Sequence, residues 1–156
     1  MGPLTAFVDT NVIIEHLEGN VDLLDIRERF DALYSNNIVF SEALMVYLMA
    51  LTGERPYTLK HNPNIIRNLS EELLDFLGLF GLFLDLEINR AVETLAVEYM
   101  IKYGLLPNDA LILATCKFHG LKYLISFDSD FANACESEGI SLISDPEEIT
   151  RVGDVP

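Results

Sequence analysis

Four acidic residues stand where a carboxylate could do chemistry. Asp9 and Asp128 each follow a short apolar run that predicts a buried strand, and Glu42 and Asp109 each fall in the first turn of a predicted apolar helix. In an open parallel α/β sheet, the functional crevice lies at the carboxyl ends of the strands. We therefore expect the four side chains to converge at one edge of a sheet.

Carboxylates that converge in this way require a counter-charge. They repel each other and raise their own pKa values unless cations lie between them. Hard oxygen ligands suit Mg²⁺ or Mn²⁺, which keep several waters and bind substrate phosphate. The sequence thus predicts a Mg²⁺ or Mn²⁺ site that supports metal-assisted hydrolysis of a phosphodiester. For Glu42 or Asp109 taken alone, helix-dipole compensation of about 0.3–1 kcal/mol is an open alternative.

The histidines and cysteines do not form a competing site in the sequence. His16, His61 and His119 stand at no metal-ligand spacing from one another, and His119 falls at a predicted helix end, where a cation is favourable. Cys116 and Cys135 also lack ligand spacing and lie in apolar or helical contexts. This pattern indicates reduced thiols in the core.

The elements that must position the acids alternate along the chain. Short, mostly apolar runs predict five strands, over residues 4–9, 38–40, 82–86, 122–127 and 140–143. Periodic segments predict helices over residues 12–17, 21–34, 42–51, 64–78, 89–103, 109–119 and 129–138. Ser41 is the expected cap of the third helix, and residues 52–63 are expected to form a loop. This order predicts a three-layer α/β/α sandwich around a five-stranded, mostly parallel sheet.

Composition limits the classes of function. The 156 residues fit one domain, and 50% hydrophobic content is enough for it to fold alone. Ten basic against 25 acidic side chains give a formal charge of −15, which argues against a general DNA coat. The sequence has no apolar run long enough for a membrane span and starts without secretory features, so we expect a cytoplasmic protein. Five basic residues are candidate phosphate contacts, although a solvated face explains each more simply: Arg55, Lys60, Arg67, Arg90 and Lys102.

Four motif regions, in order, resemble those of the PIN domain family, the fold of VapC-type toxin ribonucleases and of RNA-processing nucleases. The regions are FVDTNVIIEHLEG with Asp9, SEALMVYLMALTGE with Glu42, LPNDALILATCKFHG with Asp109, and LISFDSDF with Asp128. The resemblance covers nearly the whole chain, so residues 1–156 are expected to form a single PIN-like nuclease domain. It implies that the four acids bind the metal or orient metal-bound water.

The same resemblance assigns roles to three neighbouring residues. It implies that Asn11 and Ser126 support the metal-binding acids through hydrogen bonds and do not bind the metal themselves. Such proteins often carry Thr at the position of Ser126. Asp130, close after Asp128, is expected either as a fifth metal ligand or as a solvated loop residue.

The resemblance further implies an endoribonuclease that cleaves single-stranded RNA, the toxin of a type II toxin–antitoxin pair. The implied partners are an antitoxin protein and a second copy of the chain. Residues 43–51 and 65–80 carry more apolar side chains than one buried stripe requires. A second subunit, an inhibitory partner or a larger core explains this excess.

Three alternatives remain open at the sequence level. The first is an RNA-processing nuclease of the same family. The second is a phosphohydrolase with an aspartyl nucleophile, although such enzymes usually carry a second Asp where this chain has Asn11, and no strand-end Lys is present. The third is a PIN-like interaction module without catalysis, against which the repelling acids argue.

Overall fold

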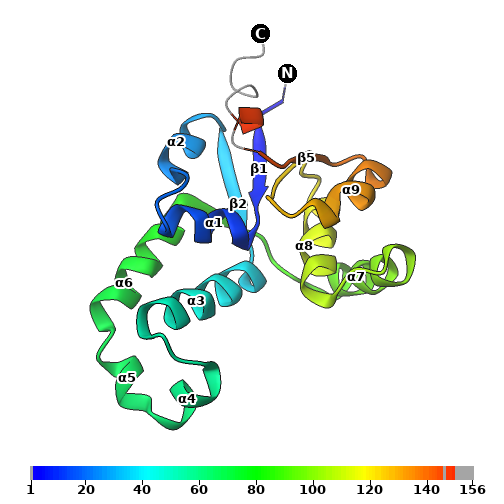
Figure 1. Cartoon of the computed structure of the whole chain (residues 1–156). Coiled ribbons are helices and arrows are strands. Elements are labelled where there is room, and N and C mark those ends of the chain that lie inside the picture. Colours follow the sequence, from blue (N-terminus) through cyan, green and yellow to red (C-terminus); the bar gives the residue numbers. More distant parts are fainter. Residues whose placement is uncertain (1, 146, 150–156) are drawn as a thin grey trace.

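The computed structural model describes residues 2–145 and 147–149, and at its centre lies a sheet of five parallel strands (Figure 1). The strands are β1 (Thr5–Val8), β2 (Ala32–Ser35), β3 (Phe83–Asp85), β4 (Tyr123–Ile125) and β5 (Ser141–Ile143). Their order is β3-β2-β1-β4-β5, and every pair of neighbours is parallel. In this register Phe7 lies beside Tyr34 on one side and Leu124 on the other. The predicted sheet is confirmed, and it is parallel throughout.

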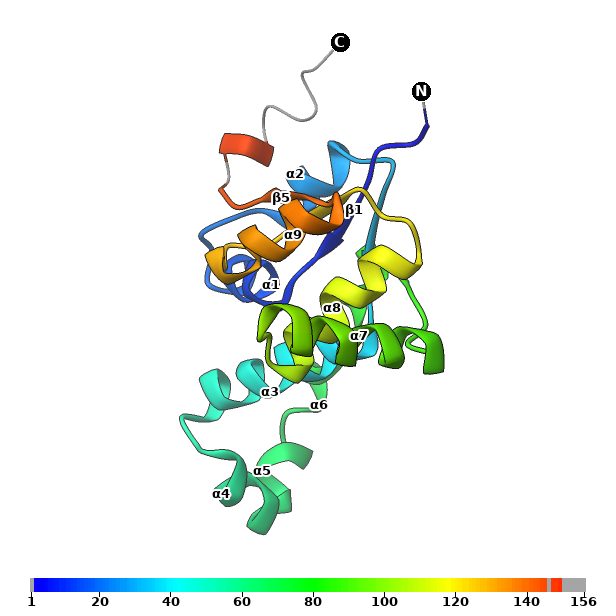
Figure 2. The ribbon, with the colours of Figure 1, turned by 90° about the vertical axis from the view of Figure 1, so that its right-hand side faces the viewer.

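Helices cover both faces of the sheet. They are α1 (Thr10–Leu17), α2 (Leu23–Glu28), α3 (Asn37–Thr52), α4 (Pro56–His61), α5 (Pro63–Arg67), α6 (Ser70–Leu79), η1 (Phe80–Leu82), α7 (Arg90–Tyr103), α8 (Pro107–Phe118), η2 (Ser129–Phe131) and α9 (Ala132–Glu138). Figure 1 shows α1, α2, α3 and α6 on one side of β1 and β2, and α7, α8 and α9 on the other; Figure 2 looks onto this second layer. The predicted α/β/α layering is confirmed. Among residues 2–145 and 147–149, none of the helices combines the length and apolar character that crossing a bilayer requires.

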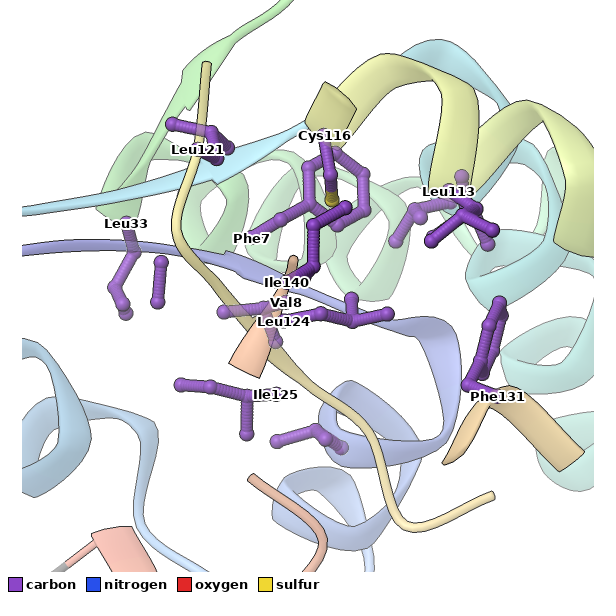
Figure 3. Close-up of a cluster of buried hydrophobic side chains, with 14 of the residues drawn as sticks. Phe7, Val8, Leu33, Leu113, Cys116, Leu121, Leu124, Ile125, Phe131 and Ile140 are labelled. Atoms are coloured by element: carbon purple, nitrogen blue, oxygen red, sulfur yellow. The ribbon is translucent and has the colours of Figure 1, made fainter. Parts of the chain in front are cut away.

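The central strands are buried because helices pack on both of their faces, and such strands read as continuous apolar runs. Figure 3 shows part of this core, including Phe7 and Val8 of β1, Leu124 and Ile125 of β4, Leu113 and Cys116 of α8, and Phe131 of η2. All four labelled strand residues are 0% exposed. The ends of β1 and β4 are therefore held firmly, and so are the residues that follow them.

Both cysteines belong to this core. Cys116 and Cys135 are buried free thiols. Burial raises the pKa of the Cys135 thiol to about 11 and lifts that of Cys116 well above its ordinary value. The thiols stay protonated at neutral pH, and the prediction of reduced core cysteines is confirmed.

The region around β2 differs from the prediction. The expected helix over residues 21–34 ends at Glu28, and the expected strand over residues 38–40 lies in the first turn of α3. Asn36, rather than Ser41, caps α3, because the Val39 amide donates to its side-chain oxygen at 3.0 Å. The run of two β-branched residues and one aromatic residue at 38–40 is typical of a strand, but this cap and the burial of Val39 favour helix.

The segment after α3 is also more helical than predicted. The expected loop over residues 52–63 contains α4, and the expected helix over residues 64–78 is divided into α5 and α6. Pro56 and Pro63 each occupy a first helical position. A proline there loses no helical hydrogen bond, so the prolines begin short helices where the sequence suggested a break. In both views α4 and α5 lie at the end of the molecule away from the strands.

Candidate active site

An open cavity of about 360 Å³ lies at the carboxyl ends of β1 and β4. These strands are neighbours, but the chain moves from β1 toward β2 on one side and from β4 toward β5 on the other, which makes this the switch point of the sheet. Its lining residues are Asp9, Thr10, Asn11, Ile14, Glu15, Glu42, Val46, Asp109 and Asp128. The structure therefore brings the four predicted acids together from four separate stretches of the chain.

Asp9 joins the end of β1 to the start of α1. Its amide donates to the Ile125 carbonyl at 2.9 Å, and its Oδ1 accepts from the Thr10 amide at 2.7 Å. Its Oδ2 accepts from the Ser126 hydroxyl at 2.7 Å, and the residue is only 5% exposed. Burial raises the pKa of the Asp9 carboxyl above its ordinary value, while the bonds from Ser126 and Thr10 oppose that rise.

A small network connects the first turn of α1 to the loop after β4. The Ser126 hydroxyl oxygen accepts from Asn11 Nδ2 at 3.3 Å and from the Asp128 amide at 3.1 Å. The Asn11 side-chain oxygen accepts from the Phe127 amide at 3.1 Å. Asn11 and Ser126 thus connect the Asp9 carboxylate to the backbone that carries Asp128. A supporting role of Asn11 and Ser126 in the active site stays a prediction.

Glu42 lies on the second turn of α3, because that helix begins at Asn37. The expected first-turn position was wrong, so helix-dipole compensation does not account for this acid. Its Oε1 accepts from the Thr10 hydroxyl at 3.0 Å, and its Oε2 accepts from Asn108 Nδ2 at 3.0 Å. Sequence reasoning missed both donors. Their adjacency to Asp9 and Asp109 is the feature that could have identified them.

Asp109 lies in the first turn of α8, as predicted, and is partly buried. Burial, followed by the negative charges of Asp9, Asp128 and Glu42, raises the pKa of the Asp109 carboxyl to about 6. Asp109 thus lies close enough to the other three acids for their charges to oppose its ionisation.

Asp130 does not share the cavity. It is exposed in η2, and its amide donates to Asp128 Oδ1 at 2.9 Å. Glu15, which sequence reasoning missed, lines the cavity instead, one helical turn after Asn11. The histidines have other neighbours: His16 accepts from the Leu23 amide, His61 lies against Tyr57, and His119 contacts the Glu87 carbonyl.

The donor chemistry fits a hydrated divalent cation. Within the described residues, there is no group of three or more His, Cys, Asp or Glu side chains that could hold a metal ion, as a cage of protein ligands does. Mg²⁺ rarely needs such a cage, since it keeps several waters and takes one or two carboxylates directly. Hard oxygen ligands spaced around an open cavity suit that mode of binding.

Comparisons with known proteins agree with this architecture. A family model described as "PIN domain" matches residues 6–137. Ribonuclease VapC2 of Methanocaldococcus jannaschii is 38% identical over 129 residues, covering 80% of this chain and 85% of that protein. Ribonuclease VapC6 of the same organism is 37% identical over 143 residues, covering 84% and 93%. A solved toxin–antitoxin complex from Klebsiella pneumoniae contains a chain that is 25% identical, with a TM-score of 0.53, covering 81% of this chain and 90% of that one.

Proposed function

This chain belongs to the PIN domain family, and from that premise we propose that it is a divalent-metal-dependent endoribonuclease that cleaves single-stranded RNA. The observation that carries the proposal is the group of carboxylates from four separate segments around one open cavity. The names of its relatives VapC2 and VapC6 support ribonuclease activity. The proposal treats residues 1–156 as one nuclease domain.

In this proposal Asp9, Glu42, Asp109 and Asp128 hold Mg²⁺ or Mn²⁺, either as direct ligands or by orienting metal-bound water. The bound cation supplies Lewis-acid activation of water and neutralises charge on the phosphodiester. Ser126 orients Asp9, while Thr10 and Asn108 orient Glu42 through the bonds described above. An acidic cavity by itself repels phosphate, so an RNA phosphate would enter the cavity only when a cation is present. The exposed position of Asp130 favours the solvated-loop interpretation over a fifth ligand.

A cleavage assay tests the proposal. Purified protein with an end-labelled single-stranded RNA should release shorter fragments when Mg²⁺ or Mn²⁺ is added. A chelator should stop cleavage, and excess metal should restore it. The same sequence as duplex RNA and as DNA provides the matched control for substrate class. Chelator-resistant cleavage would contradict the metal requirement, while a covalent phosphoaspartate at Asp9 would favour the phosphohydrolase alternative.

We also propose that the protein acts in the cytoplasm as the toxin of a toxin–antitoxin pair. The names of its relatives and the solved toxin–antitoxin complex support this role and an antitoxin partner. A small neighbouring gene encoding a DNA-binding half and an amphipathic half would support it further. If no such gene is present, an RNA-processing role becomes the better proposal.

Exposed apolar side chains support a homodimer as part of the proposal. On α3, Met45 and Leu51 are 39% and 41% exposed, and on α6, Leu74 and Leu77 are 67% and 57% exposed. Apolar side chains exposed on these two helices fit a protein interface. Light scattering at several protein concentrations should give twice the mass of one chain. A single-chain mass at every concentration would contradict the dimer.

A further inference from the structure

Basic residues gather in one segment of this acidic chain. Between Glu54 and Glu71 the sequence carries Arg55, Lys60 and Arg67 and no Asp or Glu, although the formal net charge of the whole chain is −15. This segment contains α4 and α5. We refer to residues 55–68 as the basic arm.

The charges of the basic arm are exposed and are not neutralised by neighbours. Arg55, Lys60 and Arg67 are exposed, and in the part of the chain that the structure describes, none of the three forms an ion pair. Arg67 donates only to the neutral side chain of Asn64. Four other basic side chains do contact carboxylates: Arg29, Arg90, Lys102 and Lys117. Free positive charge is therefore available on the arm.

The basic arm also presents an aromatic side chain to solvent. Tyr57 is 76% exposed and lies against His61, with 4.3 Å between the ring centroids. The two residues are one helical turn apart on α4, so they share a face. An exposed aromatic ring beside unpaired cations is the combination that binds single-stranded nucleic acid, by stacking on bases and attracting phosphates.

Helix α3 connects the basic arm to the cavity. Glu42 and Val46 line the cavity, and the same helix ends at Thr52, shortly before α4 (Figure 1). From Glu42 to Gly53 the helix rises about 16 Å, which a few nucleotides of extended strand can span. One RNA strand could thus contact the arm and the cavity together.

We propose that the basic arm is the RNA-docking subsite of this enzyme, where Arg55, Lys60 and Arg67 bind backbone phosphates and Tyr57 stacks on an unpaired base. The inference rests on the proposed ribonuclease function. It gives the acidic chain a local source of attraction for its polyanionic substrate, at a distance from the repelling carboxylates. The recognition is of single-stranded backbone and bases, without a sequence code.

The test measures RNA binding separately from chemistry. An Asp9→Asn background slows cleavage by about 100-fold or more, and a fluorescent single-stranded RNA of about 12 nucleotides serves as the binding probe. Arg55→Ala/Lys60→Ala should weaken binding about tenfold or more and reduce the slope of log affinity against log salt by about 1.4. Arg90→Ala/Lys122→Ala, the matched control on other elements, should leave both quantities nearly unchanged. Tyr57→Ala should weaken binding about tenfold, and Tyr57→Phe should retain it.

Activity on a small substrate separates this inference from the proposed function. With Asp9 intact, the arm variants should hydrolyse bis-p-nitrophenyl phosphate at the wild-type rate. A molecule of that size bound in the cavity is too short to contact the arm as well. If the wild type cleaves RNA but the arm variants bind RNA as tightly as their parent, the docking subsite is wrong and the nuclease stands. A change in oligomeric mass with no change in RNA affinity would assign the arm to protein contacts instead. An absence of RNA binding and cleavage by the wild type would overturn both proposals.

Discussion

Asp9→Asn should lower the rate of RNA cleavage by about 100-fold or more, the loss typical of removing a preorganised charged group from an active site. Asn preserves the shape of the side chain and can still accept a hydrogen bond from Ser126. It removes the negative charge that a divalent cation requires. Asp128→Asn should have a loss of similar size, because Asp128 lines the same cavity from the neighbouring strand. Initial rates on labelled RNA at saturating Mg²⁺ measure both effects.

Asp85 provides the matched control for these substitutions. It also ends a strand, β3, but it is exposed and does not line the cavity. Asp85→Asn should therefore cleave RNA at the wild-type rate. If Asp9→Asn and Asp128→Asn retained full activity while remaining folded, the metal-assisted mechanism proposed above would be wrong.

Asp109→Asn should make the metal-free protein more stable and remove most of its stabilisation by metal. The folded-state pKa of Asp109 is about 6, above the ordinary value of 3.8, so the folded protein holds this proton more tightly than the unfolded chain does. The wild type should therefore lose stability as pH rises from about 4 to about 6. At pH 7 we expect a gain for Asp109→Asn of about 1 kcal/mol, discounted for partial exposure, or about 3 °C in Tm.

Adding metal should reverse this order. A cation at 100 times its Kd stabilises the folded wild type by about 2.7 kcal/mol, whereas Asp109→Asn lacks one ligand and should gain much less. Thermal unfolding with chelator and with Mg²⁺ or Mn²⁺ at pH 7 measures both changes, with Asp85→Asn as the control. If metal stabilised the wild type and Asp109→Asn equally, Asp109 would not be a metal ligand.

The strand-end acids could be predicted from sequence because their environment is local. A carboxylate directly after a buried apolar run, such as Asp9, marks the edge of a parallel sheet without knowledge of the partner strand. The helix over residues 109–119 could be predicted for the same reason, since Pro107 marks its start and Gly120 marks its end in the sequence. These local patterns were enough to indicate the layered fold and the neighbourhood of the cavity.

What the sequence did not reveal depends on contacts between distant residues. The start of α3 is fixed by Asn36. Its Nδ2 donates to the hydroxyl of Thr115, which lies 79 positions later in the chain, at 3.0 Å. Without that contact, the β-branched and aromatic residues at 38–40 favour a strand. The orientation of the Glu42 carboxylate likewise depends on the hydrogen bond from Thr10, which lies 32 positions away. Asp130 is exposed and does not line the cavity although it is close to Asp128 along the chain, which favours the solvated-loop alternative.

The Ser126 hydroxyl has one proton and two lone pairs, and all three are engaged, by Asp9, Asn11 and the Asp128 amide. The side chain of Asp9 is consequently oriented as the protein folds. If Asp9 is a metal ligand as proposed, an arriving ion would meet an oxygen whose rotational freedom is already lost, so the entropic penalty of immobilising that oxygen would be incurred during folding and not during ion binding. Selectivity for ion size would then depend on a carboxylate held in a fixed position and not on a mobile one.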